Sequence, residues 1–115
     1  MSTMSSFSAK GLLGELEQLV LIAVLHLGDD AYAVSIRDEI EARTHIVLNR
    51  SSVYVTLDRL ERKGYVRSRF GPPTPERGGK AKRLFQVSAA GQRALAAAEA
   101  ALSRMRRPRQ VRGLR

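Results

Sequence analysis

A chain of 115 residues with 20 basic and 11 acidic side chains, a formal charge of +9, has room for one small domain. Its core is near the lower size limit for an isolated fold, so a partner subunit is a natural source of further buried surface. The absence of cysteine excludes disulfides, thiol nucleophiles and cysteine-bound zinc, and the longest apolar run, residues 19–25, is far shorter than the roughly 20 residues that cross a bilayer.

The charges are distributed unevenly along the chain. Residues 1–49 carry three basic and seven acidic side chains, a balance of −4, whereas residues 50–115 carry 17 basic and four acidic ones, a balance of +13. This asymmetry predicts a surface that attracts a polyanion. The alternative is a charge excess that serves only solubility.

The first ten residues are rich in serine and are predicted to be disordered. They lack the apolar core of a signal peptide, so we expect a cytoplasmic protein with no membrane partner. A helix is predicted to follow, from Gly14 to Gly28. Its apolar residues have the spacing of one helical face: Leu16, Leu19, Val20, Ala23, Val24 and Leu27. Leu21, Ile22 and Leu25 widen this stripe, which predicts burial within the domain and against a partner.

Two further helices are predicted before residue 64. The second covers about residues 31–43, with Asp29 and Asp30 as caps for its N-terminal N–H groups. The third begins after Asn49, a good N-cap, and ends at Gly64. Its buried line consists of Val53, Leu57 and Leu60.

The remaining positions of the third helix include candidate DNA contacts: Arg50, Ser51, Ser52, Tyr54 and Arg59. Small hydroxyl residues at a helix N-terminus let the backbone approach a duplex, and the N–H groups and dipole there favour phosphate. The Tyr54 hydroxyl can reach a phosphate or a base edge. The alternative is an ordinary capped surface helix with Tyr54 half-buried.

A basic hairpin is predicted after the third helix. Its strands cover about residues 66–70 and 83–87, and the Pro/Gly-rich residues 71–80 form its tip. The hairpin carries Arg67 and Arg69 and four candidate DNA contacts: Arg77, Lys80, Lys82 and Arg83. A basic tip can follow a groove and neutralise phosphates, although exposed hairpins also use lysine and arginine merely to block edge pairing.

The last helix is predicted over residues 89–106. Its apolar residues Leu95, Ala98, Leu102 and Met105 are spaced by three and four positions, which predicts a short coiled-coil-like seam and a dimer interface. The alternative is that this seam packs on its own domain. The arginine-rich residues 107–115 are predicted to be a disordered basic tail.

The sequence contains no motif for catalysis or metal binding. His26 and His45 are 19 residues apart without a nearby acidic cluster, and they are predicted to be structural or solvated. There is no Gly-rich phosphate loop, nucleophile elbow or metalloprotease motif. We therefore predict neither an enzyme nor a bound metal or cofactor.

Five short motifs occur in order between Leu13 and about Ala97. They are Leu13-Gly14-Glu15-Leu16-Glu17, Gly28-x-x-Ala31-Tyr32-x-Val34-x-Ile36, Val53-Tyr54-x-Thr56-Leu57-x-Arg59-Leu60-Glu61-x-Lys63-Gly64, Thr74-Pro75-Glu76-Arg77-Gly78-Gly79 and Ser88-x-x-Gly91. Each motif is weak alone. Together, at these spacings, they resemble the PadR family of transcriptional regulators.

The resemblance implies a homodimeric winged-helix repressor. The last helix would pack against the first and last helices of the partner, which adds Leu16 to the expected interface. The third helix would enter the major groove, with Tyr54 as the family's DNA-contacting tyrosine. Many members have Ser-Pro-Gly where this chain has Asn49-Arg50-Ser51, so the N-cap is kept while Pro and Gly are lost. Some relatives bind phenolic or drug-like effectors, but nothing in this chain specifies a ligand.

The sequence therefore predicts a mainly α fold with a small β-hairpin. A winged helix-turn-helix domain (11–88) is followed by a C-terminal dimerisation helix (89–106), between disordered segments 1–10 and 107–115. We expect a DNA-binding transcriptional regulator, a homodimeric repressor that binds double-stranded DNA at a pseudo-palindromic operator. The alternative is a winged-helix protein-interaction module whose third helix and hairpin dock on an acidic protein surface.

Overall fold

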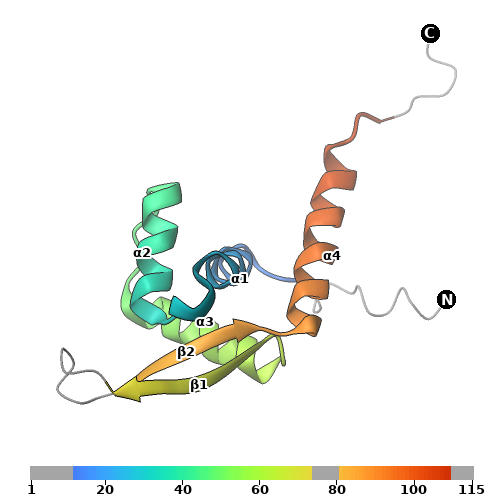
Figure 1. Ribbon diagram of the computed structural model, residues 1–115. Helices are drawn as coiled ribbons and strands as arrows, with labels where there is room; N and C mark the ends of the chain where they lie inside the picture. The colour runs from blue at the N-terminus through green and yellow to red at the C-terminus, as the bar shows by residue number, and fades with distance from the viewer. Residues whose placement is uncertain (1–11, 74–80, 110–115) are drawn as a thin grey trace, which may run out of the picture.

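The computed structural model describes residues 12–73 and 81–109. Its elements are α1 (Glu15–Leu27), the 3-10 helix η3 (Gly28–Asp30), α2 (Ala33–Thr44), α3 (Arg50–Arg62), β1 (Val66–Pro73), β2 (Ala81–Val87) and α4 (Ala89–Arg106). Helices α1 and α2 lie above the β1–β2 hairpin, α3 runs alongside the hairpin behind it, and α4 rises from the end of the hairpin opposite its tip (Figure 1). The predicted mainly α fold with a small hairpin is confirmed. Of the two segments that were expected to be disordered, 1–10 and 107–115, residues 1–10 and 110–115 lie outside the described residues.

Helix α1 runs through the middle of the fold and contacts α2, α3, β2 and α4. Val20, Leu21 and Val24 are almost completely buried by these neighbours. Much of the wide apolar stripe of the sequence is therefore explained by packing within one chain. Leu25 is the exception, because 46% of its surface stays exposed.

Helix α2 begins later than the sequence predicts, and the expectation that Asp29 and Asp30 cap it is wrong. Both aspartates lie in η3, and the N-cap is Tyr32, whose N–H donates to the Ser35 hydroxyl at 3.0 Å. Ala31, which lies between Asp30 and Tyr32, is extended and buried, and its carbonyl accepts the Phe85 N–H of β2 at 2.8 Å. This pairing with the hairpin keeps the chain out of helical geometry until Ala33.

Helix α3 has the bounds and the buried line that its sequence indicates. The Asn49 side chain accepts the Ser52 N–H at 2.8 Å, and Val53, Leu57 and Leu60 have no exposed surface. The helix stops before Gly64, whose φ of 79° lies in the left-handed region that glycine adopts without strain.

The hairpin is longer than predicted. Its strands pair antiparallel from Val66 opposite Val87 to Pro73 opposite Ala81, with an irregularity between Phe70 and Pro73. The sequence places the residues from Gly71 onward in the tip because of their prolines and glycines. They can continue the strand because a two-stranded hairpin has only edge strands, where a missing N–H is tolerated.

The base of the hairpin is joined tightly to the start of α4. The Ser88 hydroxyl caps α4 by accepting the Gly91 N–H at 3.0 Å, and it donates to the Gly64 carbonyl at 2.6 Å. Gly91 packs so closely that an added Cβ would lie 2.2 Å from the Tyr65 carbonyl oxygen. Only glycine fits there, and the contact fixes the direction in which α4 leaves the domain.

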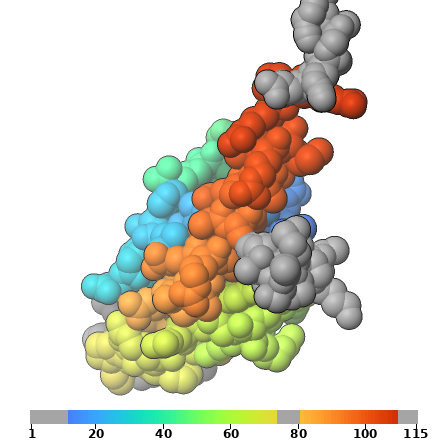
Figure 2. Space-filling view, turned by 90° about the vertical axis from the view of Figure 1, so that its right-hand side faces the viewer, coloured from blue at the N-terminus to red at the C-terminus, as the bar shows by residue number. Residues whose placement is uncertain are grey.

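The apolar seam of α4 is divided in two. Leu95 and Ala98 are buried in the core of their own chain, whereas Leu102 and Met105 are 45% and 83% exposed. Figure 2 shows why, because the later turns of α4 extend past the body formed by the other elements. Among the helices in the described ranges, none has the length and apolar character that a bilayer span requires.

A buried ion pair ties the start of α1 to the end of α3. Glu17 is buried, with 5% of its surface exposed, and its carboxylate accepts from Lys63 Nζ and from the Gly14 N–H, both at 2.8 Å. Burial raises the pKa of Glu17, but the hydrogen bonds from Lys63 and Gly14 outweigh it and hold the pKa below its ordinary value.

We expect Glu17→Gln to lower the free energy of unfolding by about 1–2 kcal/mol at neutral pH, less than for a fully buried pair because Lys63 is partly exposed. A carboxyl with a lowered folded-state pKa stabilises the fold above its unfolded-state pKa, near 4.3, and loses this contribution as pH falls through the folded-state value. Urea unfolding at pH 7 and pH 3 measures the effect. A stability difference that is equal at both pH values would contradict this role for the carboxylate.

Candidate nucleic-acid interface

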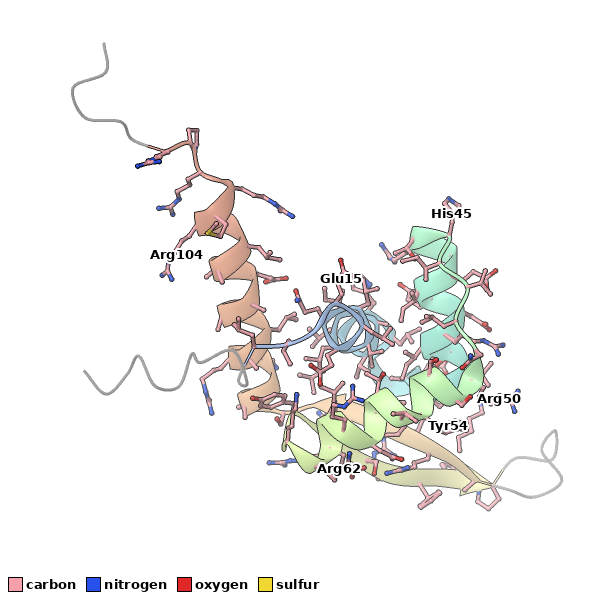
Figure 3. All side chains as sticks on the ribbon, turned by 180° about the vertical axis from the view of Figure 1, so that it is seen from behind. Glu15, His45, Arg50, Tyr54, Arg62 and Arg104 are labelled. Atoms are coloured by element: carbon pink, nitrogen blue, oxygen red, sulfur yellow. The ribbon has the colours of Figure 1, made fainter. Side chains whose placement is uncertain are left out.

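The surface of α3 opposite the core is a continuous exposed stripe. Ser51, Val55, Asp58 and Arg62 lie on it, because positions three and four apart share one side of a helix. Tyr54 is 42% exposed at the edge of this stripe. Figure 3 shows Arg50, Tyr54 and Arg62 distributed along α3, so the stripe extends over the whole length of the helix.

The N-terminus of α3 is open to solvent. Arg50 and Ser51 are exposed, and Ser52 is half-buried. The Asn49 side chain accepts from the Ser52 N–H and, at 3.2 Å, from the Ser51 hydroxyl. The helix dipole and the N–H groups of this first turn favour an anion, and the neighbouring Arg50 adds a full positive charge.

A shallow hollow of about 360 Å³ lies beside this end of α3. Its lining residues are Leu16, Asn49, Ser51, Ser52, Val55, Thr56 and Arg59. The hollow brings three of the predicted DNA contacts together on one surface. It also places Leu16, a predicted dimer residue, beside them, where it is half-buried against the core.

The two described basic candidates of the hairpin have different surroundings. The Lys82 ammonium lies 4.3 Å from the centre of the Tyr32 ring, near the start of α2. The Arg83 guanidinium forms ion pairs with Glu61 and, at 3.5 Å, with Asp58, so its positive charge is balanced by carboxylates of α3. Arg77 and Lys80, the other two candidates, lie outside the described residues.

Several exposed residues of α3 and of the hairpin were left out of the predicted site. Val55 and Arg62 belong to the exposed stripe of α3, and their spacing from Ser51 could have identified them. Arg67 and Arg69 are exposed on β1, opposite Gln86 and Leu84. Strand alternation places both arginines on the face that does not contact α3.

The arrangement of these elements defines a class of protein. A recognition-type helix, α3, is packed on α1 and α2 and flanked by an antiparallel hairpin, which is the architecture of a winged helix-turn-helix domain. The sequence model of the family described as "Transcriptional regulator PadR-like family" matches residues 21–97. The chain belongs to this family of transcriptional regulators, which are not enzymes.

Solved structures share the fold at low sequence identity. A PadR-like transcription factor from Bacteroides fragilis is 20% identical with a TM-score of 0.68, over 90% of this chain and 88% of that one. A transcriptional regulator from Clostridium thermocellum is 18% identical with a TM-score of 0.66, over 78% and 84%. A PadR family transcriptional regulator from Eggerthella lenta is 22% identical with a TM-score of 0.62, over 90% and 83%. A comparison with curated protein sequences gave no match.

Proposed function

We propose that this PadR-family protein is a homodimeric repressor that binds a pseudo-palindromic DNA operator. Residues 11–88 would bind DNA and residues 89–106 would dimerise. The observation that carries the proposal is the exposed stripe of α3, which begins at an open, positively charged helix N-terminus and lies beside a basic hairpin. A helix of this kind fits the major groove of B-DNA, and a basic hairpin fits the adjacent backbone.

The exposed side chains of α3 divide into backbone and base contacts. The Arg50 side chain and the N–H groups of Arg50 and Ser51 would hold a phosphate, which sets the position of the helix on the duplex. Tyr54 would donate its hydroxyl to a phosphate or a base edge, and Val55 would meet the methyl group of a thymine. The proposed contacts are Arg50, Ser51, Ser52, Tyr54, Val55, Arg59, Arg62, Arg69 and Lys82, with Arg77 and Lys80 outside the described residues.

The proposed dimer rests on the later turns of α4. Leu102 and Met105 expose apolar surface on a helix that extends past the domain, which suits packing against a second copy. Leu95 and Ala98 would anchor this helix on its own core. Two copies would place their α3 helices about 34 Å apart, one turn of B-DNA, and a dimer bound there would block transcription of the adjacent gene.

The direct test is a gel shift on the gene's own upstream region at two salt concentrations. Binding to DNA should weaken steeply with salt, because phosphate contacts release counterions, and should survive nonspecific competitor at one site. Footprinting then locates that site. If nonspecific competitor DNA abolishes all binding to the upstream region, the result would favour the alternative function, a protein-interaction module that docks on an acidic protein surface.

We expect removal of hairpin charge to weaken binding to every duplex. Lys82→Ala and Arg69→Ala should each reduce the slope of log affinity against log salt by about one unit, because each removes one phosphate contact. The measurement is a binding isotherm at several salt concentrations. Arg104→Ala, on the far part of α4 (Figure 3), is the matched control and should leave the slope unchanged. If the salt slopes of Lys82→Ala and Arg69→Ala both equal the wild-type slope, these two residues do not contact phosphate and only protect a strand edge.

A further inference from the structure

We propose that Arg83 is a positioning residue that holds the hairpin against α3 and does not itself contact DNA. The inference rests on the proposed DNA-binding function, and it gives Arg83 a different role from the phosphate contact that its place in a basic hairpin suggests. Its basis is the set of partners around the guanidinium.

The Arg83 guanidinium is part of a ring of hydrogen bonds that joins three elements. Its Nη2 donates to Oε1 of Glu61, and its Nε donates to the Ser68 hydroxyl at 3.2 Å. That hydroxyl donates in turn to Oε2 of Glu61 at 2.8 Å, and Arg83 Nη1 lies 3.5 Å from Oδ1 of Asp58. Because α3, β1 and β2 each supply a member, the ring fixes the hairpin relative to the recognition helix.

The same contacts make Arg83 a poor phosphate ligand. Its side chain is about one-third exposed, and its guanidinium lies 5.0 Å from the centre of the buried Phe85 ring. If Arg83 turned toward a phosphate, the carboxylates of Glu61 and Asp58 would lose their positively charged partner beside a polyanion, which is unfavourable. With the ring of hydrogen bonds intact, the positive charge of Arg83 offsets the negative charges of these two carboxylates. Helix α3 then approaches DNA with less electrostatic repulsion.

Lysine distinguishes the two possible roles of this position. A phosphate contact needs mainly a positive charge, which lysine supplies nearly as well as arginine. The ring needs a planar fork that donates in several directions at once, and a lysine ammonium cannot reproduce it. Arg83→Lys therefore keeps the charge and removes the geometry.

The test compares Arg83→Lys and Glu61→Gln with the wild-type chain in operator binding over a range of salt. We expect each variant to weaken binding by about fivefold with an unchanged salt slope, and the double variant to weaken it little more than either alone, as for two members of one network. Glu61→Gln is informative because removing a negative charge near DNA would by itself tighten binding. Arg69→Ala, an arginine on the other face of the hairpin, is the matched control and should reduce the slope instead.

A second readout does not need DNA. Loss of the ring should speed amide hydrogen exchange across β1 and β2 in the free Arg83→Lys protein, with no such change in Arg69→Ala. Wild-type affinity in Arg83→Lys, together with tighter binding by Glu61→Gln, would overturn the proposal and make Arg83 a phosphate contact. If the wild-type protein shows no salt-dependent DNA binding, the proposed function itself fails. Unchanged exchange rates in Arg83→Lys would instead reject only the positioning role of Arg83 and leave the proposed DNA binding in place.

Discussion

Tyr54→Ala is expected to leave the melting temperature almost unchanged and to weaken operator binding by about 1–3 kcal/mol, the range of one good base or phosphate contact. The reason is its position, because the side chain is 42% exposed at the edge of the outward stripe of α3. Its removal opens no cavity in the core. Thermal unfolding and a binding isotherm, measured on the same preparation, check both parts of the expectation.

Leu57→Ala is the matched variant on the inner side of the same helix. Leu57 has no exposed surface, so truncation removes buried contacts and leaves a cavity that costs about 2–5 kcal/mol of stability. The fraction that remains folded should bind the operator with near wild-type affinity. The two variants thus separate stability from binding on one helix. If Tyr54→Ala unfolds the domain while its folded fraction binds normally, Tyr54 is a core residue and the proposed surface is wrong.

Leu102→Glu should convert a dimer into a monomer. Leu102 lies on the part of α4 that projects beyond the domain, and in the proposed dimer its exposed apolar surface is covered by a second copy. A carboxylate buried there without a partner costs several kcal/mol of association free energy. The monomer should bind the operator far more weakly, because it can contact only one half-site. Light scattering reports the mass, and a gel shift reports the affinity.

Ser103→Glu is the control for this substitution. Ser103 is exposed and lies about 100° around the helix from Leu102. The substitution therefore adds the same negative charge to α4, but away from the apolar seam. It should stay dimeric and bind as the wild type does. A Leu102→Glu protein with unchanged mass would move the interface to another surface, such as the one around the exposed Leu25.

The sequence alone determined those features that depend on residues close together in the chain. Asn49 and Ser88 are N-caps because each side chain reaches an N–H three residues ahead, and Gly64 ends α3 because its backbone is left-handed. The buried line of α3 follows from its 3.6-residue period. The family also followed from local motifs at fixed spacings, and the match over residues 21–97 confirms it.

The tertiary structure decided the features that depend on distances between elements. Ala31 reads as helical but is held extended by the Phe85 N–H of β2, and Arg83 is a basic hairpin residue whose partners come from α3. The α4 seam has one uniform spacing, yet Leu95 is buried and Leu102 is exposed because the body of the domain ends between them. Spacing along a chain encodes which face of an element a residue occupies. It does not encode which distant group will lie opposite that face, and this requires the packed fold.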